Sequence, residues 1–130
     1  MVGRRGEHVV AAFLCSQNWH PAITDAEGYD ILATKGEDIL RVQVKACPKP
    51  SKTSPSRNVV YYQWTCGIGR HKEILIPKDH YDVLALVALG PNFIRFINAE
   101  DVNKKSYRIK PEDLNAGLAG DTWREITNAL

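Results

Sequence analysis

The stretch Ile39-Leu40-Arg41-Val42-Gln43-Val44-Lys45-Ala46 alternates between apolar and polar residues. Alternation with a period of two is typical of a β-strand that buries one face. Leu40, Val42 and Val44 therefore point one way, and Arg41, Gln43 and Lys45 point the other. The pattern predicts that Gln43 and Lys45 lie together on one face of a single strand.

Another strand is predicted just before it, over residues 29–34, and Asp30 lies near its start in the sequence Gly28-Tyr29-Asp30-Ile31. The residues Lys35-Gly36-Glu37-Asp38 are typical of a hairpin turn. Because strands joined by a short turn pair with each other, we expect Asp30 to lie beside Gln43.

The first element is predicted to be an amphipathic helix over residues 6–18. Val9, Val10, Phe13 and Leu14 recur at helical spacing, Gly3 and Gly6 loosen the start, and Asn18 is a reasonable stop. This helix carries Glu7, an acidic residue in its first turn.

The rest of the chain adds strands and helical segments. An extended piece is expected at 19–24, strands at 59–65, 82–89 and 93–97, a loop at 47–57, a basic turn at 67–72, a short helix at 98–105 and a final helix from an Asp121 N-cap to Leu130. This order predicts one α+β (α/β) domain over residues 1–130, with a mixed β-sheet flanked by helices.

Glu7, Asp30, Gln43 and Lys45 together suit phosphodiester cleavage. Mg²⁺ prefers oxygen ligands, which Asp30 and the Gln43 amide would supply, while Glu7 would hold a metal-bound water. Lys45 would orient the nucleophilic water or stabilise charge on the phosphate. Each residue alone also has a structural interpretation: Gln43 and Lys45 as the solvated face of an edge strand, Asp30 as a strand-start cap, and Glu7 as an acid suited to the helix dipole.

About the first 65 residues resemble the PD-(D/E)xK nuclease superfamily, in the motifs G-x-x-G-E, G-Y-D-I, V-Q-V-K and Y-Y-x-W. The likeness is greatest to small Holliday-junction resolvases, and the Q-x-K ending is similar to a homing-endonuclease branch. The resemblance implies a restriction-endonuclease-like fold, Mg²⁺ (or Mn²⁺) dependence, a dimer or higher oligomer, and the Val44 carbonyl as a further metal ligand. Tyr29 stands in place of the Pro in the motif, and Gln43 stands where an acid is usual.

Basic residues near this site are candidates for DNA contacts. The loop after the Gln43 strand carries Lys49, Lys52 and Arg57, and the turn at 67–72 carries Arg70 and Lys72. An equally open alternative is that both segments are solvated loops that do not contact DNA. A third group, Lys104, Lys105, Arg108 and Lys110, is interpreted as solvated surface.

Alternating aromatic residues mark the predicted strand at 59–65. Tyr62 and Trp64 share one face, and Tyr61 and Gln63 share the other, so one pair is expected to be core. Gln63 or Tyr61 on the remaining face is a candidate for contact with substrate.

Composition limits the class of protein. The chain has 130 residues, 44% hydrophobic, with a formal net charge of +2 and three widely spaced cysteines. These values predict a globular, reduced, intracellular protein with no membrane span. The DNA-cleaving role that the resemblance implies would make it cytoplasmic and nucleoid-associated. The partners expected are DNA and a second copy of the chain. Two rivals stay open: an inactive nucleic-acid-binding module of the same fold, and a nuclease subunit of a larger complex that docks through the apolar strands at 82–97.

Overall fold

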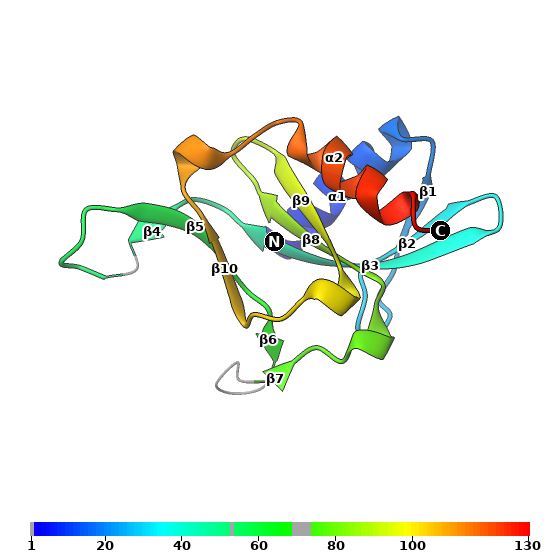
Figure 1. Ribbon diagram of the computed structural model, residues 1–130, viewed down its shortest axis with the longest axis horizontal. Helices are drawn as coiled ribbons and strands as arrows, with labels where there is room; N and C mark the ends of the chain where they lie inside the picture. The colour runs from blue at the N-terminus through cyan, green and yellow to red at the C-terminus, as the bar shows by residue number, and fades with distance from the viewer. Residues whose placement is uncertain (1, 53, 69–73) are drawn as a thin grey trace.

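The computed structural model describes residues 2–52, 54–68 and 74–130. Its centre is a five-stranded sheet in the order β1-β2-β3-β8-β9 (Figure 1). The strands are β1 (His20–Ile23), β2 (Ile31–Lys35), β3 (Asp38–Cys47), β8 (Val83–Ala88) and β9 (Phe93–Asn98). Only β3 and β8 pair in parallel, so the sheet is mixed.

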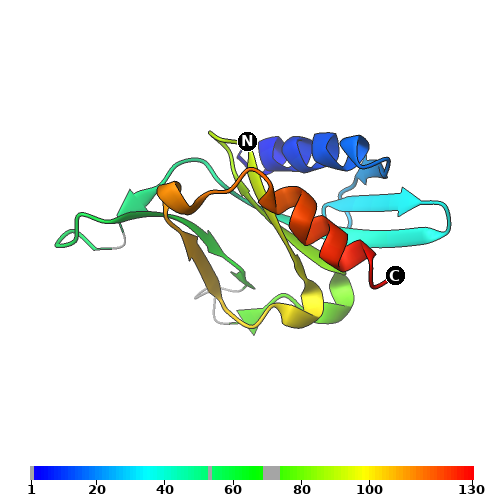
Figure 2. The ribbon, with the colours of Figure 1, turned by 45° about the horizontal axis from the view of Figure 1, so that its top comes forward.

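Two helices, α1 (Val2–Ser16) and α2 (Leu118–Thr127), cover one face of this sheet (Figure 2). Their apolar sides pack on the inward residues of the strands. The members of this core include Leu14, Trp19, Val42, Phe96 and Trp123. Apolar burial on this scale is the main favourable term in folding.

A second layer covers part of the other face. It is a three-stranded sheet in the order β10-β5-β4, formed by β10 (Ser106–Ile109), β5 (Val60–Thr65) and β4 (Ser51–Lys52). Trp64 on β5 is 2% exposed, and its indole Nε1 donates to the Val87 carbonyl oxygen at 2.9 Å. This confirms that Tyr62 and Trp64 form the buried face of the strand.

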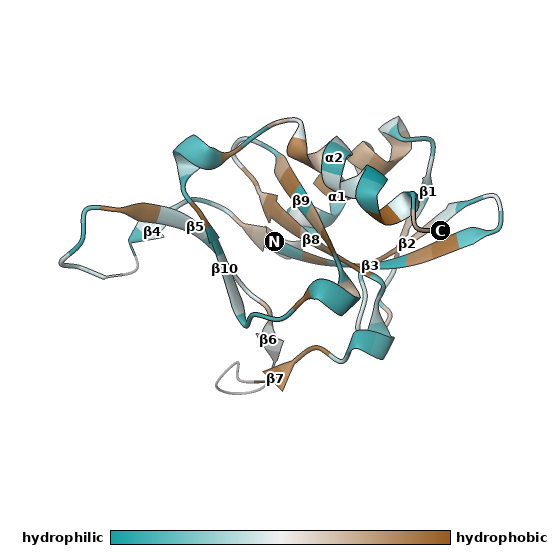
Figure 3. Cartoon of the chain, viewed as in Figure 1, coloured by the Kyte–Doolittle hydropathy of each residue, from teal (hydrophilic) through white to brown (hydrophobic). Residues whose placement is uncertain are grey.

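The remaining elements are short. They are β6 (Gly67–Ile68), β7 (Ile74–Leu75) and the 3-10 helices η1 (Lys78–His80), η2 (Ala99–Asp101) and η3 (Pro111–Asp113). Figure 3 shows the apolar residues concentrated along the central strands and polar residues on η1, η2 and η3. No helix in the described part of the chain is long and apolar enough to cross a membrane.

The alternation along β3 is confirmed. Leu40, Val42 and Val44 are buried toward the helices, while Gln43 and Lys45 are half-buried on the other face. β3 lies between β2 and β8, so the interpretation of Gln43 and Lys45 as part of an edge strand is wrong.

Several predicted boundaries need correction. α1 begins at Val2, four residues before the predicted start at Gly6. Gly6 does not loosen the helix but packs against β3, where a Cβ on Gly6 would lie 2.7 Å from the Ala46 Cβ. The chain leaves the helix before Asn18, whose φ of 63° turns the chain toward β1. α2 starts at Leu118, so Asp121 lies in its first turn and is not the N-cap.

Further corrections concern the strands. β2 begins at Ile31, and the strand expected at 59–65 begins at Val60 and belongs to the second sheet. The loop expected at 47–57 contains β4, and only η2 is helical within 98–105. β10 has no counterpart among the predicted strands. Every residue of β8 is buried and both of its edges are paired, so the predicted docking surface at 82–97 is wrong for this strand.

Candidate active site

A pocket of about 380 Å³ brings three parts of the chain together. They are the 26–30 loop that leads into β2, the outward face of β3, and the segment around η1. Asp30, Gln43 and Lys45 all line this pocket. The structure therefore brings together three of the four side chains that the sequence singles out for catalysis.

Asp30 is fixed by β3. Its Oδ2 accepts a hydrogen bond from the Val44 N–H at 2.8 Å, and its own N–H donates to the Val42 carbonyl at 2.8 Å. Within a strand, the N–H and C=O of one residue point to the same side. The Val44 carbonyl therefore faces the side on which the Asp30 carboxylate lies.

Lys45 points into the space between β3 and the second layer. Burial raises the pKa of the Cys66 thiol, and the nearby Lys45 ammonium partly opposes that shift. Lys45 and Gln43 both line the pocket, so they share one face of β3 as the alternation along this strand predicts.

Glu7 approaches from α1 and does not line the pocket. Burial raises the pKa of its carboxyl above 4.5, and the negative charge of Asp30 adds to that effect. Arg4 Nη1 pairs with Glu7 Oε1 at 2.9 Å, and Arg4 Nη2 lies 3.4 Å from Asp25 Oδ1. Glu7 is therefore an electrostatic neighbour of Asp30, held by Arg4.

Sequence reasoning missed two parts of the pocket. His80, at the end of η1, and Tyr29 both line it. Gly28 has φ +91°, and a Cβ there would lie 2.5 Å from the His80 Cβ. Nothing in the local sequence links the 26–30 loop to His80, which is brought there by the tertiary fold.

The donor atoms suit a hard cation. Asp30 offers a carboxylate, Gln43 an amide carbonyl and Val44 a backbone carbonyl, all of them oxygen ligands of the type that Mg²⁺ prefers. Among residues 2–52, 54–68 and 74–130, no three His, Cys, Asp or Glu side chains group as a metal site. A cation here would depend on the neutral carbonyls and on water for most of its ligands.

The predicted DNA-contact residues are dispersed. The segment that contains β4 and leads from the end of β3 to β5 projects from the molecule, and we call it the β-arm (Figure 1). Lys49, Lys52 and Arg57 are exposed on this β-arm. Gln63 lies on β5 outside the pocket, where its Nε2 donates to Ser106 Oγ at 3.1 Å. Arg70 and Lys72 lie outside the described residues.

Two solved structures share this architecture. A bacterial homing endonuclease, I-Ssp6803I, aligns with a TM-score of 0.74 at 11% identity, over 98% of this chain and 92% of its own. The Holliday junction resolvase Hjc from Archaeoglobus fulgidus aligns with a TM-score of 0.50 at 14% identity, over 86% of both chains. The chain has a restriction-endonuclease-like fold. Neither a protein-family model nor a curated sequence matches it.

The restriction-endonuclease-like fold places the pocket in an architecture that the two solved nuclease structures share. Fold alone does not establish activity, because one fold hosts many functions. The chemistry available to the pocket depends on Asp30, Gln43 and Lys45, which line it.

Proposed function

We propose that this protein is a Mg²⁺-dependent DNA endonuclease that hydrolyses phosphodiester bonds. The observation that carries the proposal is the convergence of Asp30, Gln43 and Lys45 in one pocket. It is supported by the restriction-endonuclease-like fold and by the two nucleases that share it.

The residues have distinct roles in this proposal. Asp30, the Gln43 amide oxygen and the Val44 carbonyl would hold Mg²⁺, and Mn²⁺ would substitute for it. The bound cation would supply charge stabilisation and a more acidic water. Glu7 would hold a metal-bound water. Lys45 would orient the attacking water or offset the charge that develops on the phosphate.

We further propose that the enzyme acts as a homodimer or higher oligomer. One domain of this size contacts little duplex, and two active sites are needed to cut both strands. The substrate would be a DNA structure such as a four-way junction, or a sequence read as by a homing endonuclease. Lys49, Lys52 and Arg57 on the β-arm would contact the phosphate backbone.

Cleavage assays test the proposal. Wild-type, Asp30→Ala and Lys45→Ala proteins would be incubated with supercoiled plasmid, linear duplex and a four-way junction, each with Mg²⁺, Mn²⁺ or EDTA. We expect metal-dependent cutting by the wild type that both substitutions reduce by at least about 10²-fold. Cutting that persists in Asp30→Ala would contradict the site, and the preferred DNA form would identify the substrate.

A second candidate is a nucleic-acid-binding module that has lost catalysis. The observation that favours it is Gln43, which leaves few acidic ligands in the pocket. Calorimetric titration with Mn²⁺, with and without DNA, separates the two. Metal binding that Asp30→Ala removes supports the nuclease, and DNA binding without metal binding supports the module. Cleavage that requires a second protein would indicate a nuclease subunit of a larger complex.

A further inference from the structure

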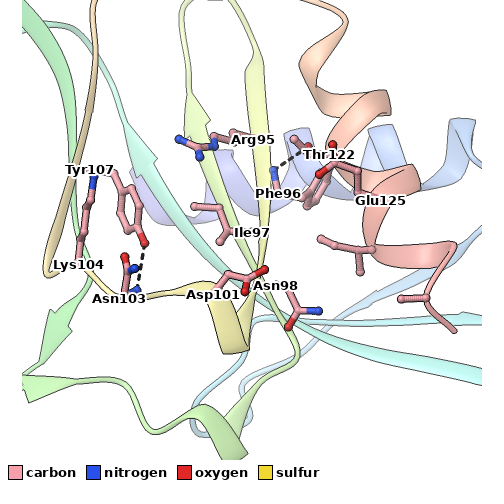
Figure 4. Close-up of a pocket in the computed structure, with 12 residues that line it drawn as sticks. Arg95, Phe96, Ile97, Asn98, Asp101, Asn103, Lys104, Tyr107, Thr122 and Glu125 are labelled. Carbon is pink, nitrogen blue, oxygen red and sulfur yellow. Dashed lines mark hydrogen bonds between the residues drawn. The ribbon is translucent and has the colours of Figure 1, made fainter.

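A basic pocket lies at the far edge of the five-stranded sheet from the candidate active site. It has a volume of about 430 Å³ between β9 and β10 and is lined by Arg95, Lys104, Ser106, Tyr107 and Arg108. Arg95, Lys104 and Tyr107 also line a larger cavity of about 600 Å³ that continues to α2 (Figure 4). We call the smaller space the β9–β10 pocket.

Arg95 is placed by the register of the sheet. Lys45 pairs with Leu86, and Leu86 pairs with Arg95, so the three residues form one row on one face. Leu86 is 0% exposed beneath the second layer. Lys45 and Arg95 therefore lie on opposite sides of that layer, about 10 Å apart at their Cα atoms from two strand spacings.

The Arg95 guanidinium is half-buried and directed toward the space between β9 and β10 (Figure 4). Within the described part of the chain it forms no ion pair. Lys104 Nζ lies 5.9 Å from the centre of the Tyr107 ring, in a cation–π arrangement. Arg95 on β9 and Lys104 in the segment just before β10 thus both line the pocket, and Arg108 on β10 adds a third cation.

The acidic side chains of the larger cavity lie outside the β9–β10 pocket. Asp101 and Glu125 line the larger cavity but not the β9–β10 pocket. Three cations with the Ser106 and Tyr107 hydroxyls, and no carboxylate in the lining, match the chemistry of a phosphate group.

A peptide strand added to the β9 edge fits less well. The Phe96 N–H, which faces that edge, already donates to Thr122 Oγ1 of α2 at 3.0 Å. Strand addition needs free backbone groups along the edge. The cations favour a polyanion instead.

We propose that the β9–β10 pocket binds a backbone phosphate of the DNA substrate, apart from the phosphate held at Asp30 and Lys45. The inference rests on the proposed nuclease function. The contact adds affinity and orients the substrate, and it takes no part in bond cleavage.

DNA binding without metal tests the proposal. Affinity for a labelled duplex would be measured in EDTA over a range of NaCl concentrations for wild type, Arg95→Ala, Arg95→Gln and Arg108→Ala. Arg124→Ala is the control, because Arg124 is exposed on α2 outside this pocket and its loss changes the charge equally. We expect each pocket variant to weaken DNA binding roughly three- to tenfold. The negative slope of log K for DNA binding against log salt concentration should become less steep by about 0.9, because one phosphate contact is lost.

The outcomes distinguish this proposal from the nuclease proposal. DNA binding by the pocket variants that equals that of Arg124→Ala would overturn the β9–β10 pocket and leave the nuclease intact. A wild type that neither binds nor cuts DNA would overturn both. NMR titration of the Arg95 side chain with inorganic phosphate identifies the source of the ligand. If Arg95 responds to phosphate but the pocket variants keep the DNA affinity of wild type, the pocket is a free-phosphate site and the nucleic-acid role is contradicted.

Discussion

Gln43 is the residue on which the chemistry of the site depends most. In the proposed site it supplies a neutral amide carbonyl to the pocket that Asp30 also lines. Gln43→Glu should tighten Mn²⁺ binding by about tenfold, because ligand charge largely sets the affinity of oxygen sites. Calorimetry measures the effect, and Gln63→Glu, outside the pocket, is the matched control. An equal gain in both variants would show that Gln43 is not a ligand.

Asp82 illustrates a residue whose role is structural. Its Oδ2 accepts from the Arg41 N–H at 2.7 Å and from Arg41 Nε at 3.1 Å, and its Oδ1 accepts from Arg41 Nη2 at 3.1 Å. Partial burial alone would raise the pKa of Asp82, but the hydrogen bonds from Arg41 outweigh it and hold the pKa below 3.8. The pair ties the start of β8 to β3.

Asp82→Asn should lower the free energy of unfolding at pH 7 by about 1 kcal/mol, a modest value because both side chains are partly exposed. Since the folded-state pKa is depressed, the ionised carboxylate contributes stability above pH 3.8 that is lost as the pH falls through the folded-state value. Urea denaturation at pH 7 and below pH 3 should show the difference shrinking at low pH. Asp113→Asn, on the exposed η3, should have little effect at either pH.

At the scale of elements, Gly6 sets the distance between α1 and β3. Gly6→Ala would place a Cβ 2.7 Å from the Ala46 Cβ, so α1 would have to move away from the sheet. We expect a loss of about 1–3 kcal/mol of stability, despite the better helix propensity of Ala. Gly3→Ala is the control, because nothing lies within 4 Å of a Cβ there. Thermal or urea denaturation that ranks the two variants in the opposite order would contradict this packing.

The 26–30 loop is the element that carries Asp30 into the pocket. Gly28→Ala would combine a strained φ of +91° with a contact of 2.5 Å to the His80 Cβ. We expect it to reduce metal-dependent cleavage by about tenfold or more, because a small displacement of a catalytic group is costly. Gly36→Ala, with φ +60° and open space around its Cβ, should lose some stability but keep activity.

For the whole molecule, the proposed homodimer is directly measurable. Light scattering of the wild type with bound DNA in EDTA should give at least twice the mass of one chain in the protein component. A monomeric mass with DNA present would contradict the proposal. Arg95→Ala should keep the same oligomer, since its proposed contact is with DNA.

The local sequence was sufficient for elements whose partners are near in the chain. The alternation in 39–46 predicted the face shared by Gln43 and Lys45, and the turn at 35–38 predicted the pairing that sets Asp30 beside β3. These features depend on a period of two and a short hairpin, which the chain specifies by itself.

Only the tertiary structure decided which distant segments meet. The parallel insertion of β8 beside β3, the separate layer of β5 and β10, and the contact of His80 with the Gly28 loop all join residues far apart in sequence. Such contacts arise because each strand must bury its apolar face against whichever surface completes the core, and no local pattern encodes that partner. The sequence therefore identified Asp30, Gln43 and Lys45, and the fold determined the pocket that encloses them together with His80, and the second basic pocket across the sheet.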